Sequence, residues 1–206
     1  TVGFGSDMTG LSTPTTINGK KIYNCTSSTD KDVRWWEDKK QYKNTIIWDK
    51  QKTTGYPFVM YYNANGDTSQ NRDKKTRWFE RIGMAVSNDM LHWQRFKTNP
   101  VMHHKIGITG DAVIQKIKDV WVMFYFGAFW EGRKDAFNRF ACSYDLVNWT
   151  DWKGEDLIHS SEPFDAKYAH KSFVVKWNGV VYHFYNAVDH KDSRGIAVAT
   201  SVELKK

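Results

Sequence analysis

Apolar and aromatic residues along this chain form short runs separated by polar turns, and one such run is written three times. Its copies span residues 58–64, 121–128 and 181–187. A second repeated segment follows each of them, at residues 84–93, 141–149 and 197–204. The matched residues Tyr62, Tyr125 and Tyr185 are spaced by about 60 residues, and a fixed period of this size indicates a repeat architecture.

Each copy is predicted to form short antiparallel β-strands. The middle copy has four, at residues 111–117, 120–128, 139–144 and 149–152. The first copy has four, at residues 45–48, 57–64, 81–87 and 93–96, and the third has three, at residues 172–176, 180–187 and 195–201. The Asn178-Gly179 pair between two apolar runs is a strong hairpin signal. The pattern therefore predicts antiparallel meanders.

A four-stranded sheet that recurs in this way is typical of a β-propeller blade, so the fold is expected to be all-β. We divide the chain into an N-terminal segment, 1–43, and three blades, 44–98, 108–153 and 170–206, of which the last is incomplete. A β-sandwich with coincidentally similar strands is the alternative. Propellers typically have about four to eight blades. Three blades would leave apolar sheet faces bare, so further blades must come from the rest of a longer protein or from another chain.

Composition and charge exclude several classes of protein. At 206 residues the chain can bury a sizeable core, and no apolar run approaches the roughly 18 residues of a transmembrane helix. The net charge is +7, but basic and acidic residues are interspersed, so nucleic-acid binding is not expected. Two cysteines provide neither a disulfide framework nor a metal cluster. The start at Thr1, without a leader sequence, indicates that a leader was removed or that the chain begins inside a longer protein.

Three segments resemble five-bladed propeller glycoside hydrolases. They are residues 80–93, with Ser87, Asp89 and Trp93; residues 143–149, with Ser143, Asp145 and Trp149; and residues 168–176. Over roughly residues 43–204 the chain is similar to glycoside hydrolase family 43 and to the related families 32, 68, 117 and 130. The resemblance implies five blades, of which three are visible here, and a substrate pocket at one end of the central axis. It also implies hydrolysis with inversion in many members, and we expect a secreted or periplasmic protein.

The first residue of each innermost strand is expected to point into that pocket. Aligned on the repeated tyrosines, Asn44, Asp111 and Lys171 take this position. Three polar residues at the mouth of apolar strands are hard to explain as core packing, because a buried charge without a partner is costly. For Asp111 the alternative is a turn residue that caps its own backbone. The family often has an Asp-Pro pair here, and Ala112 replaces the proline.

Four residues are candidates for acid/base chemistry, namely Asp111, Glu80, Glu162 and His170. Glycoside hydrolysis usually needs two carboxyl groups, one protonated and one ionised, and Asp111 with Glu80 or Glu162 would form such a pair. For either glutamate, an exposed loop carboxylate is the alternative. His170 could protonate a leaving oxygen near neutral pH, and a structural histidine is an equal alternative. The basic pair of His170 and Lys171 departs from the glutamate that the family more often uses around this blade.

Other residues are candidates for binding a substrate. Asn44 and Lys171 are expected to line the pocket, and Trp130 offers a flat ring on which the apolar face of a sugar could stack. Arg81 and Arg139 lie near the start of the third strand of their copies, where they would bind a carboxylate or sulfate or pair with neighbouring acids. No phosphate-binding loop or metal-ligand motif is found, so no cofactor is expected, although an axial calcium ion is compatible with the fold.

The expected function is hydrolysis of the glycosidic bonds of a poly- or oligosaccharide by carboxylate acid/base chemistry, with or without help from His170, in a pocket on the propeller axis. The partner is then a carbohydrate, and neither nucleic acid nor a membrane. A non-catalytic carbohydrate-binding propeller is the main alternative, which the departure at His170 and Lys171 and the missing blades favour. A protein-interaction propeller is a weaker alternative, since those usually lack polar residues on the axis.

Overall fold

The computed structural model describes residues 15–17, 20–22, 24–66 and 79–203, and within them the chain is all β. Strands β1 (Thr15–Ile17) and β2 (Lys20–Ile22) pair as a small antiparallel hairpin. Among the residues described, none belongs to a helix with the length and apolarity that crossing a membrane would require.

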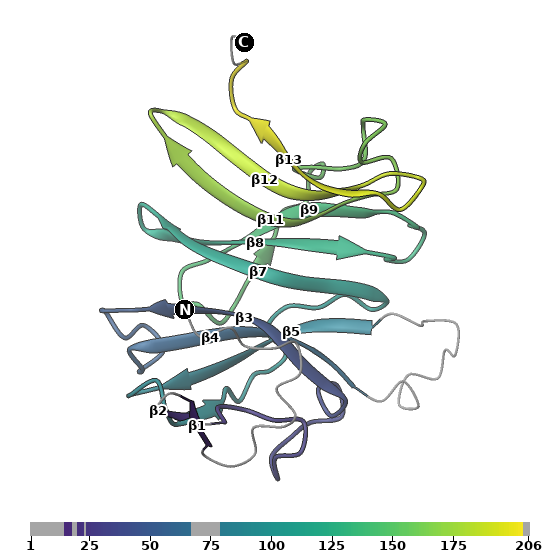
Figure 1. Cartoon of the computed structure of the whole chain (residues 1–206). Coiled ribbons are helices and arrows are strands. Elements are labelled where there is room, and N and C mark those ends of the chain that lie inside the picture. Colours follow the sequence, from purple (N-terminus) through teal and green to yellow (C-terminus); the bar gives the residue numbers. More distant parts are fainter. Residues whose placement is uncertain (1–14, 18–19, 23, 67–78, 204–206) are drawn as a thin grey trace.

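The other strands form three antiparallel groups that follow one another along the chain and are stacked in that order (Figure 1). The first contains β3 (Lys40–Trp48), β4 (Phe58–Asn65), β5 (Phe79–Ser87) and β6 (Trp93–Arg95). The second contains β7 (Gly107–Ile117), β8 (Val120–Ala128), β9 (Ala136–Ser143) and β10 (Thr150–Asp151). The third contains β11 (Tyr168–Trp177), β12 (Val180–Val188) and β13 (Arg194–Thr200). The predicted meanders are therefore present in the predicted order.

One short parallel pairing joins the first two groups. Phe79 and Glu80 of β5 pair with Gly107 and Ile108 of β7, and this links the two groups into one eight-stranded sheet. The third group is a separate three-stranded sheet. The pairing places the start of β5, with Glu80, beside the start of the innermost strand of the next group.

The inner strands β3, β7 and β11 begin earlier than the sequence predicted. They start at Lys40, Gly107 and Tyr168 rather than at residues 45, 111 and 172. The predicted strands began at or just after polar residues that interrupt the apolar pattern. In the structure each interruption is a β-bulge, at which the register shifts between Tyr42 and Asn44, between Gly110 and Val113, and between His170 and Phe173. Each strand continues beyond its bulge, because one irregular step does not end the ladder of hydrogen bonds.

The repeated tyrosines have a common structural role. Each donates its hydroxyl to a carboxylate: Tyr62 to Glu37 at 2.7 Å, Tyr125 to Asp151 at 2.5 Å, and Tyr185 to Asp165 at 2.8 Å. Burial, together with the neighbouring carboxylate, raises the pKa of all three tyrosines, so their hydroxyls stay protonated as donors. The period seen in the sequence thus preserves one hydrogen bond in each group of strands.

The repeated Ser-x-Asp segment forms a turn after the third strand. The Ser87 hydroxyl oxygen accepts a hydrogen bond from the backbone of Met90 at 2.9 Å, and Asp89 accepts one from His92 at 2.8 Å. Ser143 and Asp145 repeat this arrangement with the backbone of Leu146 and Asn148 at 2.9 and 2.7 Å. These side chains satisfy backbone donors that the tight turn leaves unpaired.

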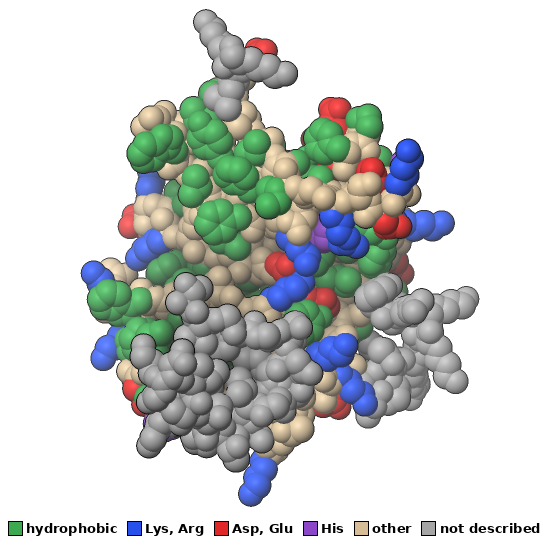
Figure 2. All heavy atoms as spheres, in the orientation of Figure 1, with side chains coloured by type: hydrophobic (Ala, Val, Ile, Leu, Met, Phe, Trp, Pro, Cys, Tyr) green, Lys and Arg blue, Asp and Glu red, His purple; other side chains and the backbone are tan. Residues whose placement is uncertain are grey.

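Burial differs between the second and third groups. Phe124 of β8 is only 9% exposed, because Val174 of β11 and its neighbours cover it. Phe184 occupies the matching position on β12 and is 38% exposed. In register with it lie Phe173 and Val198, which are 58% and 47% exposed. Figure 2 shows these hydrophobic side chains gathered over β11–β13. We call this set, with Ile196, the apolar face.

Candidate active site

Three residues at the bulges of the inner strands share an unusual backbone conformation. Lys43, Asp111 and Lys171 have φ angles of 46°, 55° and 64°. Each lies inside the bulge of its own strand, on β3, β7 and β11. Residues other than glycine are uncommon in this left-handed region, and lysine is not among the residues enriched there. Three such residues at matching positions indicate that the site constrains the backbone.

The first of these positions differs from the prediction. Lys43, and not Asn44, occupies the bulge that matches those of Asp111 and Lys171. Asn44 is exposed and pairs in register with Tyr62. The bulge of β3 holds one residue between its paired positions, whereas the bulges of β7 and β11 each hold two. Aligning the copies on their tyrosines therefore misplaces this residue by one.

The three bulge residues meet at the carboxylate of Asp111. Lys43 Nζ lies 3.1 and 3.2 Å from the two Asp111 oxygens, and Lys171 Nζ lies 3.8 Å from Oδ2. Burial opposes the charge of Lys43, but the Asp111 carboxylate raises the pKa of Lys43 overall. Burial and the nearby Lys43 ammonium lower the pKa of Lys171. One carboxylate thus lies between two ammonium groups, and Figure 2 shows such a mixed cluster in the middle of the molecule.

Asn63 connects Asp111 to Glu80. Its side-chain Nδ2 donates to Glu80 Oε1 and to Asp111 Oδ1, both at 2.5 Å, so these oxygens lie at most twice that distance apart. The Asn63 oxygen accepts a hydrogen bond from the Asp111 backbone at 2.8 Å, which fixes the orientation of the amide. A pair of carboxylates in an inverting hydrolase is separated by about 6.5–9.5 Å. Glu80 and Asp111 are too close for that arrangement, so the predicted inverting pair would need a different partner.

Glu80 is a buried acid with a raised pKa. Its side chain lies at the start of β5, and the residue is 8% exposed. Burial raises the pKa of Glu80, and the Asp111 charge adds to this effect. Hydrogen bonds from Tyr42 and Asn63 and the charge of Lys43 oppose it without reversing it. A carboxyl group in this setting keeps its proton to higher pH than an exposed glutamate, as a general acid must.

Gly110 makes room for this arrangement. A Cβ atom at Gly110 would lie 2.7 Å from Asn63 Nδ2 and 2.8 Å from Glu80 Oε1. Both distances are shorter than real Cβ contacts allow. The backbone of β7 can therefore approach the Asn63–Glu80 pair only because residue 110 lacks a side chain.

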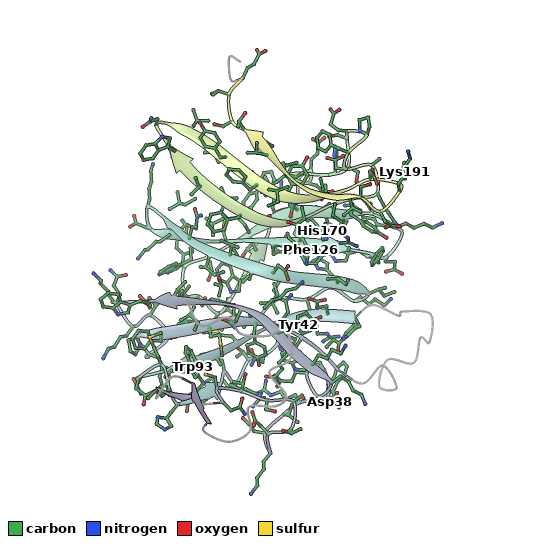
Figure 3. The ribbon with its side chains drawn as sticks, viewed as in Figure 1. Asp38, Tyr42, Trp93, Phe126, His170 and Lys191 are labelled. Carbon is green, nitrogen blue, oxygen red and sulfur yellow. The ribbon has the colours of Figure 1, made fainter. Side chains whose placement is uncertain are left out.

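His170 lies beside the cluster but holds no extra proton near neutral pH. Its Nδ1 is 3.1 Å from the carbonyl oxygen of Asn186, and its ring meets Phe126 edge-on at 5.6 Å. Burial and the Lys171 charge lower the pKa of His170 to about 4. In Figure 3, His170, Phe126 and Tyr42 lie one above another, from β11, β8 and β3. Of the two roles that the sequence left open for His170, the neutral imidazole fits a structural or positioning role better than that of a proton donor.

The contacts of Glu162 lie outside this cluster. It is exposed, in the segment between β10 and β11, and its backbone N–H donates to Asp165 at 2.8 Å. Its charge acts on Tyr185, which donates to the same aspartate. Among the described residues, the contacts of Glu162 do not extend to Asp111 or Glu80. A role for Glu162 in the chemistry stays a prediction.

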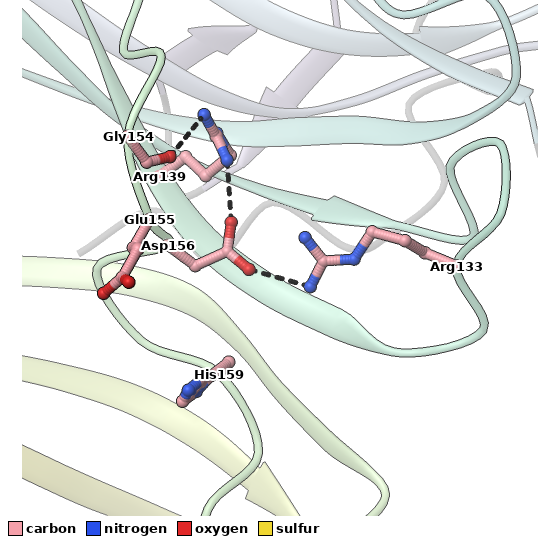
Figure 4. Close-up of a pocket in the computed structure, with 6 residues that line it drawn as sticks. All are labelled: Arg133, Arg139, Gly154, Glu155, Asp156 and His159. Atoms are coloured by element: carbon pink, nitrogen blue, oxygen red, sulfur yellow. Dashed lines mark hydrogen bonds and ion pairs between the residues drawn. The ribbon is translucent and has the colours of Figure 1, made fainter.

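Trp130 and Arg139 are held by contacts within the protein. The Trp130 indole donates to the carbonyl oxygen of Ile108 at 2.7 Å and stacks on His104, with ring centroids 3.4 Å apart. Arg139 donates to Asp156 at 2.8 Å and to the carbonyl oxygen of Gly154 at 3.3 Å. Together with Arg133 and His159 it lines a pocket of about 410 Å³ (Figure 4). Arg133 binds Asp156 from the other side at 2.7 Å, so the acid already neutralises part of the pocket's positive charge.

Arg81 packs against aromatic rings. Its guanidinium carbon lies 3.9 Å from the ring centroid of Phe79 and 4.9 Å from that of Trp35. Burial lowers the pKa of Arg81 to about 10. Of the two roles that the sequence left open for the arginines, pairing with a neighbouring acid describes Arg139. Binding of a substrate carboxylate or sulfate by Arg81 stays a prediction.

Sequence reasoning missed Tyr42, Lys43 and Asn63. Tyr42 donates to Glu80, and Asn63 joins Glu80 to Asp111. Asn63 stands at the end of the first repeated segment, where Asn186 matches it in the third copy and Phe126 in the second. The asparagine at this position, directly after an apolar repeated segment, was the sequence feature that could have identified Asn63 as a site residue. Within the part of the chain that is described, no three histidine, cysteine or acidic residues gather in a way that could hold a metal ion.

Comparison with known proteins identifies similar solved structures. One, a BT0996 complex with RGII in its description, is 54% identical with a TM-score of 0.81, over 90% of this chain and 53% of that one. A second, described as "Glycoside hydrolase", is 53% identical with the same TM-score and the same coverage of both chains. The chain thus spans about half the length of these relatives. The resemblance to glycoside hydrolases is confirmed.

More distant structures support the fold alone. A thermostable family-43 glycoside hydrolase is 20% identical with a TM-score of 0.55, over 80% of this chain and 52% of that one. Zg3597, a family 117 glycoside hydrolase produced by the marine bacterium Zobellia galactanivorans, is 17% identical with a TM-score of 0.56. The match covers 78% of this chain and 52% of that one. No family model matches the sequence, and no curated protein matches it either. The fold of this chain is therefore shared with β-propeller glycoside hydrolases.

Proposed function

We propose that this chain carries an acid/base site of a glycoside hydrolase that cleaves a poly- or oligosaccharide, with Glu80 as the proton donor. One observation carries the proposal: Glu80 is a buried carboxyl group with a raised pKa, and Asn63 links it directly to the ion-paired Asp111. The similarity to a structure described as a glycoside hydrolase supports the reaction class.

In this proposal Glu80 protonates the glycosidic oxygen as the bond to the leaving sugar breaks. Burial and the Asp111 charge favour the protonated form before the reaction. Asp111 forms a salt bridge with Lys43, and the charge of Asp111 contributes to the raised pKa of Glu80. A second carboxylate then activates water or attacks the sugar carbon, and Glu162 is our candidate because it is exposed and free to approach a substrate.

We further propose that additional sheets complete the ring, giving five blades in all. Two observations support this. The apolar face of β11–β13 is exposed among the described residues, and this chain covers only 53% of the length of the two similar chains. These sheets would come from the rest of a longer protein or from another chain. A saccharide substrate is in keeping with a secreted or periplasmic location.

The test is Glu80→Gln in the full-length protein, assayed on a panel of oligosaccharides, with Glu203→Gln as a control at an exposed position after β13. Removing a general acid lowers kcat by roughly 10²–10⁴-fold, whereas the control should leave it unchanged. Unchanged turnover in Glu80→Gln would remove this residue from the mechanism. Saccharide binding without hydrolysis in the unmodified protein would instead identify a non-catalytic carbohydrate-binding propeller.

A further inference from the structure

Two lysines are held at the site in a conformation that lysine rarely adopts. Lys43 and Lys171 both have positive φ angles, of 46° and 64°. Left-handed residues other than glycine cost free energy and persist where surrounding structure imposes them. A salt bridge to Asp111 would need only one ammonium group. The second one therefore calls for another explanation.

The two lysines do not bind Asp111 equally. Lys43 contacts both carboxylate oxygens, at 3.1 and 3.2 Å, whereas Lys171 lies 3.8 Å from one of them. An ammonium group has three donors, so the contact of Lys171 with Asp111 leaves donors for another acceptor. Lys43 is therefore the counter-ion of Asp111, and Lys171 is the ammonium group with hydrogen-bond donors left for a ligand.

The lysines are also the more accessible part of the cluster. Their side chains are 40% and 33% exposed, whereas the side chain of Asp111 is 15% exposed and Glu80 is 8% exposed. A molecule that enters the site therefore meets the ammonium groups before the carboxylates. Burial favours the uncharged form of Glu80. The two lysines therefore share one carboxylate, that of Asp111, which already forms a salt bridge with Lys43.

We propose that the site takes an acidic saccharide, with Lys171 binding the carboxylate of a uronic acid residue close to Glu80. This rests on the proposed function and names the substrate class for the same site. The bulge of β11 directs Lys171 toward Asp111, and a sugar carboxylate at the open side of Lys171 would complete the charge balance. Charge-assisted hydrogen bonds of this kind are stronger than neutral ones.

The test is direct binding to the full-length protein by isothermal titration calorimetry. The probes are D-galacturonic acid and D-glucuronic acid, each compared with its methyl ester, which removes the charge and keeps the ring. We expect the free acids to bind about tenfold more tightly than the esters. Lys171→Met should remove this preference, Lys171→Arg should keep part of it, and added salt should weaken it.

A matched control separates this proposal from a general effect of charge. Lys176 lies on the same strand, is exposed, and is far along β11 from the bulge. Lys176→Met should keep the full preference for the acids. Equal binding of acid and ester by the unmodified protein, or equal losses for both probes in Lys171→Met, would overturn the proposal. Both results come from binding and not from turnover. The kinetic test of Glu80→Gln can therefore fail without affecting this proposal, and the two failures can be told apart.

Discussion

The cluster around Asp111 and the apolar face of β11–β13 have opposite relations to the rest of the chain. At the cluster, Asp111 contacts Lys43, Lys171 and Asn63, all of which this chain supplies. On the apolar face, Phe173 and Phe184 remain 58% and 38% exposed among the described residues. Polar groups can be satisfied by one or two well-placed partners, whereas apolar area must be covered by a whole surface. The polar contacts of Asp111 are thus supplied within this chain, whereas the covering of the apolar face is not supplied by the described residues.

The largest expected effect concerns the apolar face. Phe184→Ala and Phe124→Ala change the same repeated position on β12 and β8, and only Phe124 is covered by strands described here. If a further sheet covers Phe184 in the full-length protein, both variants should lower the free energy of unfolding by about 3–5 kcal/mol. Chemical denaturation of the two variants measures this. A loss below about 1 kcal/mol for Phe184→Ala alone would mean that the face is open to solvent.

The next effect concerns the site. Gly110→Ala places a methyl group 2.7 Å from Asn63 and 2.8 Å from Glu80, so one of these must move. A displacement near 1 Å at catalytic groups lowers kcat/KM by about 10²-fold. Overpacking lowers the free energy of unfolding by about 1–3 kcal/mol. Steady-state kinetics and denaturation check both values.

Gly195→Ala is the matched control for this change, because a Cβ there meets no atom within 4 Å. It should leave both activity and stability close to those of the unmodified protein. If Gly110→Ala behaved like this control, the tight approach of β7 to Glu80 would not matter for function.

The smallest expected effect is a shift in pH dependence. Activity that needs protonated Glu80 falls as the pH rises through the pKa of that residue. The Lys43 charge lowers this pKa and the Asp111 charge raises it. Lys43→Met should therefore move the basic limb of kcat/KM to higher pH, and Asp111→Asn should move it to lower pH, each by about half to one pH unit. Shifts in the same direction for both variants would contradict Glu80 as the acid.

The sequence predicted the strand groups better than the site. The period of the tyrosines, the hairpin at Asn178-Gly179 and the run from Val120 to Ala128 follow from local patterns, and the structure has them. Asp111 and Lys171 could be found because each interrupts an apolar strand. Asn44 was off by one, since the number of residues in a bulge depends on pairing with the next strand.

Burial was also difficult to infer from sequence. Trp130 was expected to offer a flat ring to a sugar, and in the structure this ring packs against His104 and Phe137. The raised pKa of Glu80 reflects its burial, offset or reinforced by Tyr42, Lys43 and Asp111 on two other strands. Such effects depend on three-dimensional neighbours that no local pattern reports.

The parallel pairing between β5 and β7 has a mechanical consequence. Among the described residues it pairs Phe79 with Gly107 and Glu80 with Ile108, so it is a narrow seam between two groups of strands. Glu80 lies on one side of that seam, and Asp111 lies on the other. If the seam loosened, the contacts of Asn63 and Lys43 with Asp111 would have to hold the proposed acid near the residue that tunes it. The stiffness of the seam, together with those contacts, would then govern whether the proton is available when a sugar arrives.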